Sequence, residues 1–167
     1  MNTGTAGRHL VVVCGLLLWL LVAPAAPASE LPQSFTAGSF AEIAAAHAGK
    51  PFLVSAWSVS CPHCPAELRA LAELHRQHPE LDIVLIATDT PDDAETAAQL
   101  VRDYGLANAG QWIFADYVPD RLRMSIDRRW HGELPRTWFF DRTHRVEARS
   151  GVIPAPQLAQ RAKEMLR

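Results

Sequence analysis

Two continuous apolar runs dominate the hydrophobic pattern of the chain beyond its first thirty or so residues. Residues 50–59 ("KPFLVSAWSV") and 81–89 ("LDIVLIATD") keep apolar side chains at most positions, which is typical of strands buried on both faces. The stretch between them places apolar residues on one face of a helix that ends before Pro79: Leu68, Leu71, Ala72 and Leu74. Strand, helix and strand in this order predict a βαβ unit with parallel strands.

Further elements are predicted around this unit. Helical patterns cover residues 39–49, 90–105 and 154–167, and residues 136–151 indicate two strands joined by a turn. The least regular segment, 106–134, contains a candidate strand ("QWIFADYV") followed by a short helix and a loop. We therefore expect an α/β fold with a central mixed β-sheet flanked by helices on both faces.

The N-terminus has the pattern of a secretory signal peptide. Arg8 and His9 precede an apolar run from Leu10 to Val22, and Ala26-Pro27-Ala28 offers a small-residue cleavage site. The apolar run is shorter than the roughly 20 residues that span a bilayer. We expect residues 1–28 to be removed, which also removes Cys14, and the protein to be exported to a bacterial periplasm. An uncleaved membrane anchor is the alternative, and the only route to membrane contact.

The remainder has the length of one domain, 38–167, with a lead-in at 29–37. Its charge is −3 once Arg8 is removed. Acidic residues outnumber basic ones up to residue 103, and the reverse holds from residue 104. An acidic, exported chain is a poor candidate for binding nucleic acid. The basic C-terminal part is either an ordinary solvated face or a rim that favours acidic partners.

The cysteine pair in "SAWSVSCPHCPAEL" (residues 55–68) is the main chemical signal. A Cys61–Cys64 bridge would be a weak structural staple, because it closes a very short loop. A zinc site normally needs four ligands, and there is no second cysteine pair. Cys61, His63 and Cys64, with His131, are candidate ligands for a soft copper ion. A reactive dithiol is favoured, because Cys-x-x-Cys beside a βαβ pattern is typical of redox proteins. No cofactor or resident metal is then required.

The position of the pair predicts a role for each cysteine. The first strand ends and the helix begins here, so we expect Cys61 at the helix cap and Pro62 at the first helical position. Unpaired N–H groups at a helix start stabilise a thiolate and lower its pKa. His63 can add positive charge or a hydrogen-bond donor, unless it is simply exposed to solvent. Cys61 should attack and Cys64, one turn inside, should resolve the mixed disulfide.

The segment "FLVSAWSVSCPHCPAEL" resembles the active-site segment of the thioredoxin superfamily, with Trp57 four residues before Cys61. Glu67, three residues after Cys64, makes the resemblance closer to the exported TlpA/ResA group. "GELPRTWFFD" continues it, with Leu134-Pro135 where the superfamily has a cis-proline before a strand. The resemblance covers roughly residues 38–167 and implies a thioredoxin-like fold and an exported thiol–disulfide oxidoreductase.

The resemblance also assigns roles to individual residues. Pro135 is expected to be cis, and its loop, with Leu134, should pair with a bound partner; an ordinary trans turn is the alternative. Glu67 lies one helical turn from Cys64 and is expected to accept its proton, unless it is a solvated helix residue. Trp57 is expected near the cysteines, where partner contact and core packing both remain open.

Departures from the superfamily complicate the direction of electron flow. Thioredoxin carries a buried Asp where this chain has Ser55, and an aromatic residue where it has Ser60. The Pro62-His63 dipeptide matches that of DsbA, a strong oxidase, but segment 90–134 is too short for the helical domain of DsbA. We expect exchange with protein thiols and disulfides, served by an electron-donating partner. The resemblance favours a reductase acting in cytochrome c maturation or metal-site assembly; a DsbA-like oxidase and a copper-handling protein are the alternatives.

Overall fold

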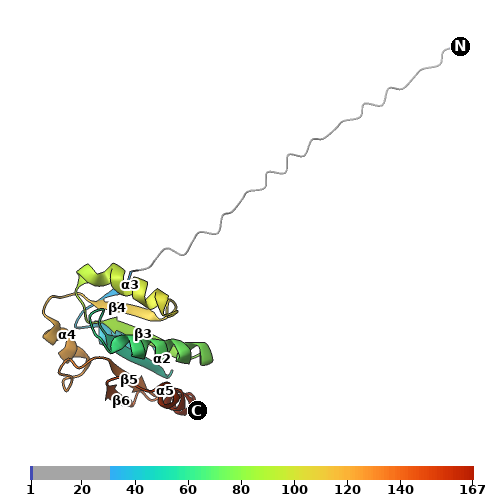
Figure 1. Cartoon of the computed structure of the whole chain (residues 1–167). Helices are drawn as coiled ribbons and strands as arrows, with labels where there is room; N and C mark the ends of the chain where they lie inside the picture. Colours follow the sequence, from blue (N-terminus) through green and yellow to red (C-terminus); the bar gives the residue numbers. More distant parts are fainter. Residues whose placement is uncertain (2–30) are drawn as a thin grey trace.

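The computed structural model describes Met1 and residues 31–167. The predicted signal peptide, its cleavage site and Cys14 lie outside the described residues. The elements run in the order β1 (Gln33–Phe35), α1 (Ser39–Ala46), β2 (Phe52–Trp57), α2 (Cys64–Gln77), β3 (Asp82–Ala87), η1 (Pro91–Asp93), α3 (Ala94–Asp103), β4 (Gly110–Phe114), α4 (Pro119–Ile126), β5 (Arg136–Phe140), β6 (Val146–Ser150) and α5 (Ala155–Leu166) (Figure 1). Each predicted strand and helix is present, with ends shifted by a few residues.

The six strands form one mixed sheet in the order β1-β4-β3-β2-β5-β6. β2 pairs in parallel with β3 and antiparallel with β5, while β5 and β6 form the predicted antiparallel pair. The parallel strands β2, β3 and β4 end at the same edge of the sheet. This edge is therefore where the loops that follow them meet, and where β5 begins.

Alternate residues of the sheet supply two hydrophobic clusters, one on each face. Leu53, Leu85 and Phe139 join side chains of α2, α3 and α5 in the first cluster. Val54 and Ile86 join side chains of α1 and α4 in the second. All six residues of β2 are buried, which explains why its sequence is apolar throughout instead of alternating. The predicted α/β fold, a mixed sheet with helices on both faces, is confirmed.

One strand was not predicted. β1 lies in the stretch that the sequence indicated only as a lead-in, and it pairs in parallel with β4 at the edge of the sheet. Phe35 is fully buried there, and its ring centroid lies 5.6 Å from that of Phe114. Three residues carry too little periodicity to identify a strand, so the anchoring of this segment depends on one aromatic side chain.

Within the described residues, no helix combines the length and the apolar character needed to cross a bilayer.

The packing of α2 on the sheet gives a first prediction. Leu71 is fully buried in the first cluster, whereas Met124 on α4 is 55% exposed. Leu71→Ala should lower the free energy of unfolding by about 2–5 kcal/mol, because it leaves a cavity under α2. Met124→Ala should change it by less than about 0.5 kcal/mol. Urea denaturation of the oxidised protein measures both values. Equal losses would mean that α2 does not pack as described.

Candidate functional site

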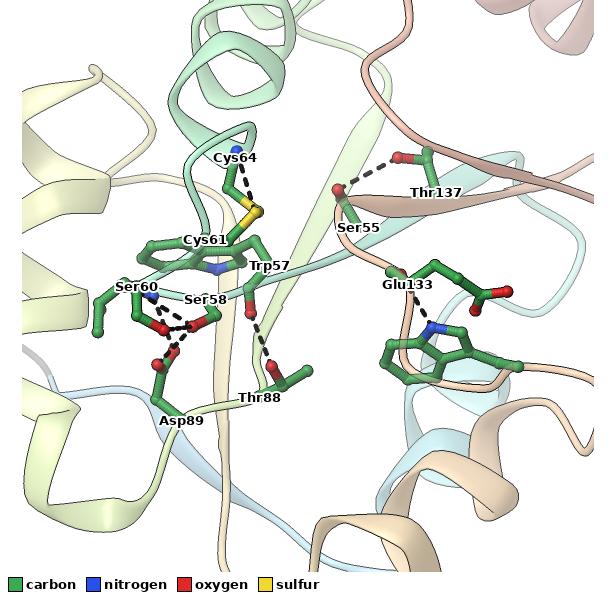
Figure 2. The surroundings of a disulfide bond; sticks show 12 residues. Ser55, Trp57, Ser58, Ser60, Cys61, Cys64, Thr88, Asp89, Glu133 and Thr137 are labelled. Atoms are coloured by element: carbon green, nitrogen blue, oxygen red, sulfur yellow. Dashed lines mark hydrogen bonds between the residues drawn. A yellow bond between two sulfur atoms is a disulfide. The ribbon is translucent and has the colours of Figure 1, made fainter.

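Cys61 and Cys64 form a disulfide at the edge of the sheet where β2 delivers the chain to α2 (Figure 2). Their Cα atoms are 5.4 Å apart. Cys64 is fully buried, while Cys61 is only partly buried. The expected asymmetry is therefore present: Cys61 is partly exposed, and Cys64 is enclosed by the protein.

The predicted cap position was wrong. The N-cap of α2 is His63, and the helix begins at Cys64. Cys61 and Pro62 lie in the preceding turn, in which Cys61 N donates to Ser58 O and Cys64 N lies 3.3 Å from Cys61 O. The turn nevertheless directs the N–H of Cys64 toward Cys61 Sγ, at 3.2 Å. The N–H at the helix start is thus shared between Cys61 O and Cys61 Sγ, and it still lies against the sulfur as the electrostatic argument requires.

Glu67 is buried, not solvated. It is 1% exposed and faces the sheet. Its Oε1 accepts a hydrogen bond from Thr137 Oγ1 at 3.0 Å, and its Oε2 accepts one from Ile153 N at 2.8 Å. Burial raises the pKa of Glu67 above its ordinary value, and the hydrogen bonds from Ile153 and Thr137 oppose this effect. Helix α2, strand β5 and the segment before α5 are joined through this one carboxyl group.

Ser55 and Thr137 complete the buried polar group beside Glu67. Both are fully buried, and their hydroxyl oxygens are 3.2 Å apart. Thr137 Oγ1 is placed to donate to either Glu67 Oε1 or Ser55 Oγ, and its single hydroxyl proton serves one of them at a time. Sequence analysis noted Ser55 only as a missing acid. Thr137 belongs to the "GELPRTWFFD" segment that carries the resemblance, but its contact with Glu67 was not predicted, because it spans 70 residues of sequence.

His63 and Trp57 differ in exposure: His63 is exposed to solvent and Trp57 is buried. His63 is exposed at the start of α2, and its side chain makes no capping hydrogen bond. Trp57 is 2% exposed and belongs to the same core cluster as Cys64. Its indole lies beside the disulfide (Figure 2). A core role for Trp57 is thus established, and its predicted contact with a partner remains a prediction.

The peptide bond between Leu134 and Pro135 is cis, as predicted. β5 pairs Arg136 with Ala56 of β2, so Pro135 lies at the end of β2 just before the cysteine loop. Leu134 is half-buried and packs against both hydrophobic clusters. The structure therefore brings the cis-proline loop and the disulfide to the same edge of the sheet.

Asp127 anchors the loop that leads to this proline, and sequence analysis did not identify it. Its Oδ2 accepts hydrogen bonds from Arg136 Nη2 at 2.9 Å and from Trp138 Nε1 at 3.4 Å. Burial alone would raise the pKa of Asp127, but the hydrogen bonds from Arg129 N, Arg136 and Trp138 bring it down to about 2. The anchoring carboxylate is therefore ionised at any pH where the protein would act.

Asp89 holds the loop on the other side of the disulfide, and it was also missed. Its Oδ1 accepts a hydrogen bond from Ser58 Oγ at 2.7 Å, and its Oδ2 accepts one from Val59 N at 3.0 Å. Asp89 closely follows β3, which is parallel to β2, so both loops leave the sheet at one edge. The sequence did contain a signal for Asp89. It is a polar residue just after a buried parallel strand, and the loops that follow parallel strands meet at one edge of the sheet.

The copper alternative has no assembled site. Among the described residues, no three His, Cys, Asp or Glu side chains are grouped closely enough to hold a metal ion. In addition, the thiolates that copper would require are joined in a disulfide.

Comparison with known proteins identifies the family. The model of the AhpC/TSA family matches residues 22–149. Because this match covers most of the chain, the protein belongs to the AhpC/TSA family. Comparison with curated proteins gives no significant match.

Solved structures show the same fold. A secreted disulfide oxidoreductase of Mycobacterium tuberculosis, homologous to Escherichia coli DsbE, is 24% identical with a TM-score of 0.60, covering 72% of this chain and 85% of its own. A thioredoxin-family thiol:disulfide interchange protein of Chlorobium tepidum is 18% identical with a TM-score of 0.60, over 74% and 85%. A secreted thiol-disulfide isomerase of Corynebacterium glutamicum is 19% identical with a TM-score of 0.57, over 73% and 74%. These structures confirm the expected thioredoxin-like fold.

The buried carboxyl group gives a prediction on pH. Glu67 keeps its proton to a higher pH when folded than when unfolded, so the folded state binds more protons. The free energy of unfolding should therefore fall as pH rises from about 4.5 to the raised pKa. Glu67→Gln should abolish this contribution, because glutamine can accept from Ile153 N and donate to Thr137 without ionising. The difference in free energy of unfolding between Glu67→Gln and wild type should grow as pH rises from about 4.5 to the raised pKa of Glu67, and then stay constant.

Urea denaturation from acid to neutral pH measures this difference. Glu95→Gln, at an exposed position in the first turn of α3, serves as the matched control and should leave the pH dependence as in the wild type. A constant difference between Glu67→Gln and wild type would contradict the raised pKa.

Proposed function

We propose that this protein is an exported thiol–disulfide oxidoreductase in which Cys61 attacks and Cys64 resolves. The observation that carries the proposal is the disulfide at the start of α2, with one partly exposed and one buried sulfur. The N–H of Cys64 lies 3.2 Å from Cys61 Sγ, where it favours the thiolate in the reduced form. The family and the fold support the same class of reaction.

In the reductive direction, the Cys61 thiolate attacks one sulfur of a partner disulfide. The partner's other sulfur leaves as a thiolate, and a mixed disulfide joins Cys61 to the partner. Cys64 then loses its proton and attacks Cys61 Sγ, which releases the second partner thiolate. Two electrons have passed to the partner, and the Cys61–Cys64 disulfide is the oxidised product. An electron-donating dithiol partner returns the protein to its reduced form.

Glu67 is proposed to accept the proton of Cys64. It lies one turn along α2 from that cysteine, and both are buried. Burial raises its pKa, which moves a carboxylate toward the range in which a general base is effective near neutral pH. His63, exposed at the start of the same helix, is proposed to stabilise the Cys61 thiolate by its positive form or by a hydrogen bond.

The partner is proposed to lie along the edge formed by Cys61 and the cis-proline loop. Leu134 and Pro135 would supply backbone and apolar contacts, and Trp57 would support the disulfide from below. Protein thiols and disulfides are the expected substrates. The sequence resemblance favours a periplasmic reductase in cytochrome c maturation or metal-site assembly. The Pro62-His63 dipeptide favours the alternative, a DsbA-like oxidase.

A trapping experiment tests the roles of the two cysteines. Cys64→Ser should leave partners attached to Cys61, because the mixed disulfide can no longer be resolved. Non-reducing electrophoresis of periplasmic extracts should show adducts that disappear on reduction. Cys61→Ser is the matched control and should give none. Equal adducts from both variants, or none from Cys64→Ser, would contradict the assignment.

The reduction potential tests the direction of electron flow. Equilibration of the purified protein with glutathione or dithiothreitol gives this value. We expect a potential nearer to about −270 mV than to about −120 mV, because the former suits a reductase and the latter an oxidase. A potential close to that of a strong oxidase would replace the reductase with the oxidase alternative.

A further inference from the structure

We infer that Asp89 is a positioning residue that holds the Cys61 loop and raises the proton affinity of the Cys61 thiol. The inference rests on the proposed function and concerns its redox poise. It begins from a series of hydrogen-bonded polar groups that joins Asp89 to Ser58 and Ser60, in the loop just before Cys61 (Figure 2). The series contains one acceptor-only group, the Asp89 carboxylate.

The direction of every hydrogen bond in this series follows from proton counting. Ser58 Oγ–H donates to Asp89 Oδ1 at 2.7 Å, which uses its single proton. Ser58 Oγ is therefore an acceptor toward its other neighbours. Ser60 N donates to it at 3.2 Å, and the hydroxyl of Ser60, 3.0 Å away, must donate to it as well. Val59 N donates to Asp89 Oδ2.

The consequence concerns the hydrogen-bond donors that remain for Cys61 Sγ. Four donors of the loop just before it are engaged elsewhere: the Ser58 hydroxyl and Val59 N by Asp89, and Ser60 N and the Ser60 hydroxyl by Ser58 Oγ. Within residues 31–167, the only hydrogen bond to Cys61 Sγ comes from Cys64 N. Asp89 thus acts in two ways: its negative charge opposes the thiolate, and it engages hydroxyl groups that would otherwise stabilise that thiolate.

The remaining charged groups near the disulfide do not duplicate this effect. His63 at the start of α2 favours the thiolate when it is protonated. Glu67 faces the sheet and is engaged by Thr137 and Ile153. Glu133, in the loop before the cis-proline, is exposed and accepts a hydrogen bond from His131 N. Among the charged side chains that the structure describes, Asp89 is the one hydrogen-bonded to Ser58 and Val59, just before Cys61.

The effect of Asp89 on the Cys61 thiolate opposes the effect of the Pro62-His63 dipeptide. Groups that stabilise the reduced thiolate make a disulfide more oxidising, and Pro62-His63 is of that kind. A group that destabilises the thiolate shifts the equilibrium of the cysteine pair from the dithiol toward the disulfide, which makes the dithiol a stronger reductant. Asp89 therefore lets the loop retain a dipeptide typical of an oxidase while serving a less oxidising role.

Asp89→Asn tests the inference. Asparagine removes the charge and presents an amide donor to Ser58, which frees the protons of Ser58 and Ser60 to turn toward the sulfur. The pKa of Cys61 should fall by about half a unit, and the equilibrium with glutathione should move about threefold toward the dithiol. The rate of alkylation of Cys61 against pH, followed by mass spectrometry of its peptide, measures the pKa.

Asp92→Asn is the matched control. Asp92 lies on η1, closely follows Asp89 and carries the same charge, but it is exposed and accepts a hydrogen bond from Tyr117 Oη instead of from the Cys61 loop. Ser58→Ala provides a second test that keeps the charge of Asp89. It removes the hydroxyl group that links Asp89 to Ser60, and it should also lower the pKa of Cys61, by less than Asp89→Asn does. Thermal unfolding of both redox forms reports whether each variant is folded.

The inference is overturned if Asp89→Asn shifts the pKa and the glutathione equilibrium no further than Asp92→Asn does, or in the opposite direction. If Asp89→Asn fails to fold, an unchanged or raised pKa in Ser58→Ala overturns it. These readouts need no partner protein. A wild type that does not exchange with glutathione at all would instead defeat the proposed function, so the two failures are distinguishable.

Discussion

The burial of β2 on both faces is the constraint on which the rest of the structure depends. Its six residues are covered by α2 on one face and by α1 and α4 on the other, and its edges pair with β3 and β5. The chain leaves this enclosed strand at its carboxyl end. The chain must turn there into α2, and this turn carries Cys61. The accessibility of one sulfur and the burial of the other follow from the fold, because Cys64 already belongs to the helix that covers the sheet.

Placing a carboxyl group in this core has a cost that the protein offsets only in part. Glu67 is removed from water, and two hydrogen bonds replace its hydration. Burial still dominates and raises its pKa, so the ionised form is destabilised. A leucine at this position would pack without that penalty. The proton transfer from Cys64 that we propose for Glu67 would require such an ionisable group, because an apolar residue cannot perform it.

Three loops from separate parts of the sequence surround the disulfide, and each is held by an acid or a backbone turn. Asp89 fixes the loop before Cys61, and Asp127 anchors the loop before Pro135 through Arg136. These carboxylates act differently on the chemistry. Asp127 is ion-paired with Arg136 and holds the loop before the cis-proline, whereas Asp89 bonds directly to the segment just before Cys61. Under our proposal, the redox poise of the site would therefore depend on residues outside the Cys-x-x-Cys motif.

The sequence by itself determined the βαβ unit, the antiparallel pair at the C-terminus, the redox character of Cys61 and Cys64, and the cis-proline at 135. Those features are local: apolar runs, helical spacing and short motifs are written in consecutive residues. Only the tertiary structure decided that α2 starts at Cys64 and that Phe35 anchors an extra strand. It also decided that Glu67 is buried against Thr137 and Ile153, and that Asp89 and Asp127 hold loops at this edge of the sheet. Each of these depends on side chains meeting across the sheet or on which N–H groups a turn has already used. Separation along the chain hides such contacts, because their energies come from burial and hydrogen bonding that exist only once the sheet has assembled.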